Sequence, residues 1–191
     1  MTLTLFPKKV SLSLLEEIWR LDKNVKIDPS FEEKVNRSAD LVKKAVNGSK
    51  PVYGINTGFG KLSNVMVSHD DTEELQRNLI LSHCCGVGDY LDISTTRLMM
   101  VLKLLSLGRG ASGVRWTTLT HIETMLANNI IPIIPDQGSV GASGDLAPLA
   151  HMSAAMIGEG EVFYLGSRVP ASRAFKDCGL KPLTLAAKEG L

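Results

Sequence analysis

Residues 138–151 have the sequence GSVGASGDLAPLAH, which carries more information than any other part of this 191-residue chain. The tripeptide Ala142-Ser143-Gly144 lies there between small residues and directly before Asp145. Gly144 has no Cβ, so its backbone nitrogen can approach another backbone group closely. Attack of that nitrogen on the Ala142 carbonyl carbon, followed by loss of two waters, would close a five-membered ring with an exocyclic methylene at Ser143. Such a group is a strong electrophile, and no ordinary side chain is one.

Simpler interpretations of this tripeptide have to be weighed beside the chemical one. Ala-Ser-Gly also occurs at residues 111–113, and a flexible turn is the ordinary interpretation of either copy. Only the second copy precedes an acidic residue at an expected helix start. Residues 108–113 also fit the pattern GxGxxG, but a dinucleotide site needs a strand before that pattern, and a helix is expected here. The four histidines have no metal-like spacing, so we predict no metal site.

Composition excludes several classes of protein. The chain is 44% apolar and 21% charged with a formal net charge of +1, which is ordinary globular usage. Without a run of basic residues, binding to nucleic acid through phosphate neutralisation is not expected. The N-terminus lacks the apolar segment of a signal peptide, and no apolar run is long enough to span a bilayer. Three cysteines without CxxC spacing suggest a reduced, cytoplasmic protein with no membrane partner.

Apolar spacings of three and four residues, with capping and stop residues, predict most of the chain to be helical. The expected helices are 11–20, 28–46, 72–85, 94–107, 117–128 and 145–157. The apolar residues expected to be buried on the first and fourth of these helices are Leu12, Leu15, Ile18, Trp19, Leu98, Val101, Leu102 and Leu105.

The remaining segments are expected to be extended, looped or short. The glycine-rich residues 51–60 predict an extended segment that enters a loop, and the prolines make residues 130–135 extended. Alternation around a Gly-Ser turn predicts a hairpin over 161–169. A last helix is expected from residue 184, and because it has no stop signal before residue 191, we expect the chain to continue in a longer protein. The sequence therefore predicts one mainly α domain with glycine-rich loops and a small β-hairpin.

Three motifs together resemble a known family. GSVGASGDLAPLAH closely resembles the signature of the aromatic amino acid ammonia-lyases, and YGINTGFG (53–60) and NLILSHCCGVG (78–88) resemble two further loops of that family. The motifs follow one another in the family's order, with similar separations, across essentially the whole chain. The resemblance implies an all-α fold of the ammonia-lyase/fumarase-like superfamily. It also implies that residues 1–191 are the N-terminal domain of a longer protein, without its C-terminal helical-bundle region.

The resemblance assigns roles to individual residues. Residues 142–144 would form the prosthetic group 4-methylidene-imidazol-5-one (MIO) without an external cofactor, and Asp145 matches the aspartate thought to assist that cyclisation. Tyr53 matches the tyrosine that takes or relays the β-proton of the substrate, and His83 matches a position that faces the substrate side chain. Judged without the family, Tyr53 would be a packed aromatic residue and His83 a histidine satisfied at a helix end.

The N-terminal stretch most resembles the bacterial histidine enzymes of the family. The resemblance therefore implies elimination of ammonia from L-histidine to give urocanate. A histidine at position 83 suits a polar substrate ring, either imidazole or phenol, so a tyrosine lyase or aminomutase stays open. A non-catalytic helical interaction module is the alternative of another class. The family also implies a homotetramer with active sites built from several subunits, so we expect the 191-residue chain alone to be inactive.

Overall fold

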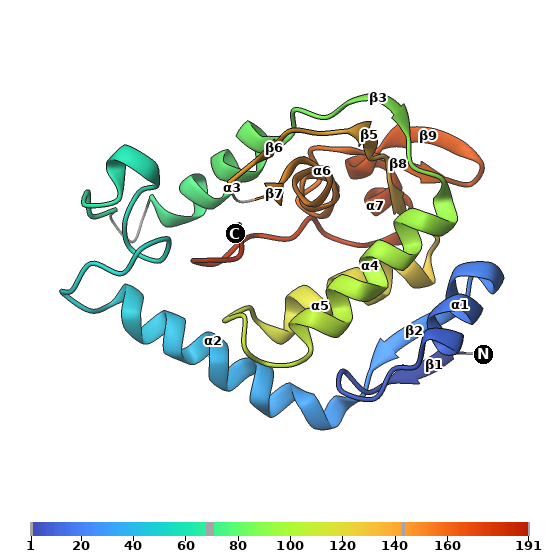
Figure 1. Ribbon diagram of the computed structural model, residues 1–191, viewed down its shortest axis with the longest axis horizontal. Coiled ribbons are helices and arrows are strands. Elements are labelled where there is room, and N and C mark those ends of the chain that lie inside the picture. Colours follow the sequence, from blue (N-terminus) through green and yellow to red (C-terminus); the bar gives the residue numbers. More distant parts are fainter. Residues whose placement is uncertain (1, 68–70, 143, 191) are drawn as a thin grey trace.

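The computed structural model describes residues 2–67, 71–142 and 144–190, and this part of the chain is mainly α-helical, as predicted (Figure 1). Short 3₁₀ turns precede two of the helices. The helical elements are α1 (Leu12–Leu21), η1 (Pro29–Phe31), α2 (Glu32–Val46), η2 (Gly60–Leu62), α3 (Thr72–His83), α4 (Ile93–Leu107), α5 (Trp116–Ala127), α6 (Ala147–Met156) and α7 (Ala171–Cys178).

The strands are short and form small, separate sheets. They are β1 (Thr2–Leu5), β2 (Asn24–Ile27), β3 (Val87–Tyr90), β4 (Ile131–Pro132), β5 (Pro135–Gln137), β6 (Val140–Gly141), β7 (Gly144–Asp145), β8 (Glu161–Tyr164) and β9 (Ser167–Pro170). β1 pairs with β2 in parallel, whereas β3–β5, β4–β8–β9 and β6–β7 are antiparallel. The β8–β9 pair is the predicted hairpin, and the extended character predicted for residues 130–135 is also confirmed.

The helices begin where capping residues predict them to begin. The Ser11 hydroxyl accepts a hydrogen bond from the Leu14 N–H at the start of α1. The Asp92 carboxylate does the same for the Thr95 N–H of α4, at 2.8 Å. Pro148 lies in the first turn of α6, where its missing N–H has no cost. Six of the helices among the described residues therefore match sequence expectations to within a few residues.

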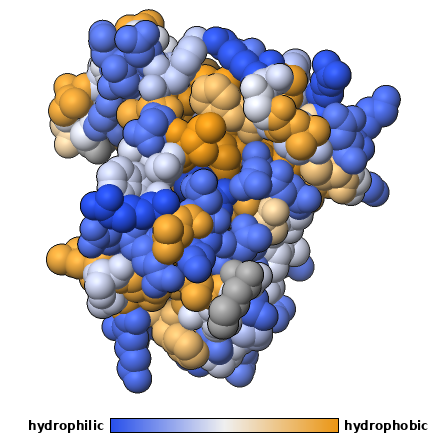
Figure 2. All heavy atoms as spheres, turned by 90° about the vertical axis from the view of Figure 1, so that its right-hand side faces the viewer, coloured by the Kyte–Doolittle hydropathy of each residue, from blue (hydrophilic) through white to orange (hydrophobic). Residues whose placement is uncertain are grey.

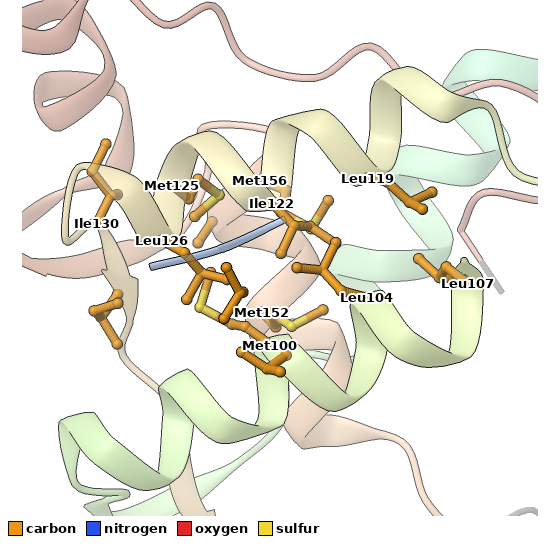
Figure 3. Packing of buried hydrophobic residues seen from close by; sticks show 14 of the residues in the cluster. Met100, Leu104, Leu107, Leu119, Ile122, Met125, Leu126, Ile130, Met152 and Met156 are labelled. Atoms are coloured by element: carbon orange, nitrogen blue, oxygen red, sulfur yellow. The ribbon is translucent and has the colours of Figure 1, made fainter. Parts of the chain in front are cut away.

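The core lies where α4, α5 and α6 meet (Figure 3). Met100 and Leu104 of α4 pack there with Ile122 and Leu126 of α5 and with Met152 of α6, and each of these residues is at most 1% exposed. Truncating a side chain of this kind to alanine costs about 2–5 kcal/mol, because lost burial adds to the cavity that remains. This core fixes α6, which follows directly after the Ala-Ser-Gly tripeptide.

Two of the predicted apolar faces are partly wrong. Val101 and Leu105 of α4 are buried as expected, but Leu102 is 45% exposed. The reason is that α4 is covered on several sides by α1, α5, β2 and β4, so its buried surface is wider than one stripe and differently centred. Leu12 at the start of α1 is 85% exposed, and Leu165 in the β8–β9 turn is 82% exposed. The face that carries α1 and this hairpin accordingly mixes apolar with polar side chains (Figure 2).

The helix predicted from residue 184 is wrong, since residues 181–186 are irregular and 187–190 form turns. The cause is Glu189, whose side chain is fully buried and accepts hydrogen bonds from Arg115, the Thr118 hydroxyl and the Ala186 N–H. Burial by itself raises the pKa of Glu189, but the bonds from Arg115 and Ala186 outweigh it and lower that pKa. A charged partner 74 residues away therefore overrides local helical propensity.

Two further segments differ from expectation. Residues 53–56 form turns, so the extended start predicted for 51–60 is wrong, whereas the predicted loop is confirmed. Helix α7 was not predicted, although its N-terminal Pro170 and its C-terminal Gly179, with φ +67°, are ordinary helix boundaries. No helix among the described residues is long and apolar enough to cross a membrane.

A buried guanidinium joins three parts of the fold. Arg97 of α4 is 2% exposed, and it donates to the carbonyl oxygens of Asp22 and Lys23 after α1. It also donates to the Leu126 carbonyl at the end of α5 and to the Asn129 side chain at 2.9 Å. Helix ends leave carbonyl oxygens without intrahelical partners, and Arg97 supplies donors for them at two such ends.

Replacement of Arg97 with methionine should lower the free energy of unfolding by about 3–5 kcal/mol, because several buried acceptors lose their donor. Arg20, which pairs with Glu16 on the exposed face of α1, is the matched control. Arg20→Met should cost at most about 1 kcal/mol, as is usual for exposed pairs. Urea unfolding of both variants measures the difference, and equal losses would contradict the role given to Arg97.

Buried His121 should make the fold sensitive to acid. The ring of His121 lies edge-on to Phe175, and burial is the main cause that lowers its pKa from 6.5 to about 4, against a hydrogen bond to Met156. Above pH 6.5 the ring is neutral in both states, so its stabilisation is complete. As the pH falls from 6.5 to about 4, His121 binds a proton in the unfolded chain but not in the folded chain, and the free energy of unfolding declines.

The expected loss over this pH window is about 3 kcal/mol from His121 alone. His121→Gln cannot titrate, so the difference in unfolding free energy between neutral pH and pH near 4 should be smaller in the variant by that amount. Urea unfolding at the two pH values measures it. An identical acid sensitivity of both proteins would show that His121 is not the titrating group.

Candidate active site

Strands β6 and β7 form a very short antiparallel pair at the segment that contains Ala142 and Gly144. Val140 pairs with Asp145 and Gly141 with Gly144, and Ser143 lies outside the described residues. Gly144 has φ +86°, a conformation that residues with a Cβ rarely adopt. A Cβ added at Gly141 or Gly144 would meet no atom within 4 Å. The backbone at Gly141 and Gly144 is therefore open rather than packed.

Asp145 ties the base of this hairpin to the start of α6. Its Oδ1 accepts hydrogen bonds from the Ser139 N–H at 3.2 Å and from the Ala147 N–H at 3.1 Å. A carboxylate at a helix start is favourable, because it meets free N–H groups and the positive end of the helix dipole. A Cβ on Gly138 would lie only 2.0 Å from Asp145 Oδ2. Position 138 must therefore be glycine for this carboxylate to sit where it does.

The 78–88 and 138–151 motifs are joined by a hydrogen bond. The Gly86 N–H donates to His151 Nε2 at 3.1 Å, so the loop after α3 is attached to α6. A Cβ on Gly86 would lie 3.0 Å from His151 Nε2 and 3.1 Å from Pro135 Cβ, so only glycine fits comfortably. Burial lowers the pKa of His151, which favours the neutral ring that can accept this bond.

Strand pairing also connects the segment after α3 to the segment that precedes the tripeptide. β3 pairs with β5, with Val87 opposite Gln137 and Tyr90 opposite Pro135. Gly88 has φ +89°, and a Cβ there would lie 2.4 Å from Asp136 Oδ1. Two segments about 50 residues apart in sequence thus run side by side, and Figure 1 shows β3 and β5 together at one edge of the molecule.

His83 is the last residue of α3, directly before the loop that holds Gly86. Its Nδ1 lies 2.7 Å from the Leu79 carbonyl oxygen, where it donates a hydrogen bond, and 3.2 Å from the Ser82 hydroxyl. In the neutral ring this assignment leaves Nε2 unprotonated, so it can accept a hydrogen bond from a ligand. The interpretation of His83 as a histidine satisfied at a helix end therefore holds for Nδ1. Nε2 remains available to a ligand.

Tyr53 lies in the turn at the start of the 53–60 motif and is 61% exposed. Its ring packs edge-to-face on Phe59, with 5.7 Å between ring centroids. The buried Asn56 holds this loop, since its side chain donates to the carbonyls of Ala45 and Lys50. Figure 1 shows residues 53–60 at the edge of the molecule, beyond the C-terminal end of α2.

The structure connects the segments that hold some of the predicted site residues, and among the described residues no such connection includes Tyr53. Hydrogen bonds and strand pairing connect the loop after His83 to the segment that holds residues 142, 144 and 145. Among the described residues, no hydrogen bond or ring contact joins Tyr53 to either of these segments. The sequence analysis missed His151, which it treated only as a histidine without metal-like spacing. A single half-buried acceptor has no sequence signature, although this one ends the 138–151 motif.

The Ala-Ser-Gly copy at residues 111–113 has a structural role, as expected for a turn. It lies in the loop between α4 and α5, where the Gly113 N–H donates to the Ser38 hydroxyl and Lys188 donates to the Ser112 carbonyl. Helix α4 precedes this loop, so the strand that a dinucleotide site requires is not there.

Loss of the acceptor at His151 should free the loop after α3. In His151→Leu the Gly86 N–H keeps no partner, so its amide hydrogen should exchange at least about tenfold faster. In His151→Gln the side-chain oxygen can replace Nε2 as the acceptor, so most of the protection should return. Hydrogen exchange resolved at Gly86 measures both effects. Unchanged protection in the leucine variant would show that the bond does not hold the loop.

Comparison with known proteins identifies a family and related enzymes. The family model of aromatic amino acid lyases matches residues 10–191. A histidine ammonia-lyase of Roseobacter denitrificans is 59% identical over 191 residues, which are 100% of this chain and 37% of that protein. The chain therefore spans little more than a third of the length of this relative.

Solved structures show the same fold. Ergothionase from Treponema denticola superposes with a TM-score of 0.93 at 32% identity and matches 100% of this chain and 38% of its own. Histidine ammonia-lyase from Trypanosoma cruzi gives a TM-score of 0.90 at 33% identity, covering 100% of this chain and 37% of that chain. Since the family model covers almost all residues and the fold agrees throughout, the chain belongs to the aromatic amino acid lyase family.

Proposed function

We propose that the chain is the N-terminal part of a histidine ammonia-lyase, which eliminates ammonia from L-histidine to give urocanate. The observation that carries this proposal is the 59% identity with a histidine ammonia-lyase over the whole chain. The junction between the 78–88 and 138–151 motifs supports it, because it places the loop after His83 against the helix that follows the tripeptide.

The electrophile of this reaction would come from Ala142, Ser143 and Gly144. The residues fit such a group: the hairpin sets Gly141 opposite Gly144, and Gly144 has a positive φ, a conformation that residues with a Cβ rarely adopt. MIO would supply an electrophilic carbon to the substrate amine and so make it a better leaving group. Asp145 would assist ring closure, since its carboxylate already holds the backbone on both sides of the tripeptide. No external cofactor is needed.

Tyr53 would accept the β-proton of the substrate. A phenol with an ordinary pKa of about 10 is mostly protonated at neutral pH, so a base of this kind needs a nearby cation or hydrogen-bond donors. In the described structure the neighbour of its ring is Phe59, which supplies neither. We therefore propose that the activating groups come from another part of the complete protein, either a further segment or a second subunit.

His83 would bind the substrate ring. Its Nδ1 is engaged by the Leu79 carbonyl, so Nε2 would accept a hydrogen bond from the imidazole N–H of histidine. A phenol hydroxyl could donate to the same atom, and tyrosine aminomutase from Streptomyces globisporus has a similar fold at 30% identity. Histidine is preferred because the identity with the histidine enzyme is much higher.

The quaternary and cellular setting belongs to the same proposal. A homotetramer in the cytoplasm would bring residues of several subunits to each site, which suits the exposed position of Tyr53. The 191-residue chain by itself would then be inactive, because groups that bind the substrate carboxylate and activate Tyr53 are supplied elsewhere.

Turnover by the full-length protein tests the function. We expect it to convert histidine to urocanate, and we expect Ser143→Ala to abolish nearly all of this activity because the methylidene carbon cannot form. The absorbance of urocanate measures the reaction, and Ser112→Ala in the other Ala-Ser-Gly copy is the matched control with wild-type rates.

The outcomes separate substrate from mechanism. Formation of coumarate from tyrosine, without turnover of histidine, would overturn the substrate assignment and leave the mechanism intact. Full activity of Ser143→Ala would overturn the mechanism itself. A folded full-length protein that turns over neither amino acid would favour the non-catalytic helical module.

A further inference from the structure

Two adjacent cysteines lie in the 78–88 motif and have no part in the proposed reaction. Cys84 and Cys85 directly follow His83 at the end of α3. Cys84 has φ −76° and ψ 60°, and the Cys85 N–H donates to the His83 carbonyl at 2.9 Å. These values define an inverse γ-turn centred on Cys84. The chain therefore turns sharply at the first thiol, between His83 and the hydrogen bond of Gly86.

The two thiols differ in their surroundings. Cys84 is half-buried and its Sγ donates to the Ile80 carbonyl at 3.3 Å, whereas Cys85 is exposed. Burial raises the pKa of the Cys84 thiol, and the charge of the neighbouring Cys85 thiolate raises it further. The third cysteine, Cys178 of α7, lies elsewhere and its Sγ contacts the Tyr164 hydroxyl at 3.2 Å.

A direct disulfide is a poor product for this pair. Consecutive Cα atoms are about 3.8 Å apart, which is below the range of about 4.4–6.8 Å in ordinary disulfides, so the bond would be strained. An atom inserted between the sulfurs relaxes this constraint. Soft thiol ligands select soft acceptors, and two thiols held in one turn bind such an acceptor as a chelate.

We propose that Cys84 and Cys85 form a dithiol site for trivalent arsenicals of the type R–As=O. Two S–As bonds form, while both S–H bonds and the As=O bond break. The two protons and the oxygen leave as one water, and arsenic stays trivalent, so no oxidant or reductant is required. Chelation draws the Cys84 sulfur away from the Ile80 carbonyl and fixes the turn beside His83. The site does not depend on the proposed lyase activity.

Intact-mass analysis of the chain with phenylarsine oxide tests the site. We expect one phenylarsenic group per chain, added with loss of one water, that resists excess 2-mercaptoethanol and is removed by 2,3-dimercaptopropanol. Cys84→Ser and Cys85→Ser should each weaken binding by about 100-fold or more, because the chelate becomes a single bond. Cys178→Ser is the matched control and should bind like the parent chain.

Because Cys85 is exposed, its replacement is not expected to unfold the chain, so weaker binding by Cys85→Ser reports on the thiol itself. Serine there removes no packing, and circular dichroism can verify that the Cys85→Ser chain keeps its helices. Tight binding that survives in folded Cys85→Ser, or an adduct that is lost with Cys178 instead, would overturn the site. Release of arsenic by the monothiol at the same concentration as by the dithiol would also overturn it.

Discussion

The hydrogen bond from the Gly86 N–H to His151 Nε2 is the contact on which the arrangement of the site depends. It joins segments 65 residues apart, and both ends are constrained. A Cβ on Gly86 would crowd the His151 ring and Pro135, and burial favours the neutral ring of His151 that can accept the bond. Because α6 packs into the core through Met152 and Met156, a loop attached to His151 is attached to a helix of the core.

The attachment to the core matters for the chemistry proposed at residues 142–144. Closing a five-membered ring within a peptide requires a compressed backbone, and such conformations persist only where the surrounding structure determines them. On one side, Asp145 links the hairpin to the start of α6, and Gly138 leaves space for its carboxylate. On the other side, β5 is paired with β3. A Cβ at Gly141 or Gly144 would meet no atom within 4 Å, so we propose that the surroundings that compress this backbone come from the complete assembly.

Sequence could predict the elements that are bounded by local signals. Ser11 and the Asp28-Pro29 pair mark helix starts, and the Gly-Ser turn marks the β8–β9 hairpin, since each acts on its near neighbours. Elements that depend on distant partners could not be predicted in this way. The segment 184–190 is irregular because Glu189 is buried against Arg115, and the parallel β1–β2 pair joins strands 22 residues apart. The exposure of Leu102 likewise depends on which elements cover α4.

Some features of the candidate site could likewise be predicted from sequence motifs, and others required the structure. The prediction of Tyr53, His83 and residues 142–145 as site residues came from motif resemblance, whereas the hydrogen bond of His151 required the structure. The most direct measurement is the mass of the peptide that contains residues 138–151, released from the active full-length protein and from the 191-residue chain alone. The account predicts a peptide two waters lighter from the full-length protein and the unmodified mass from the short chain. An unmodified peptide from a fully active enzyme would contradict it.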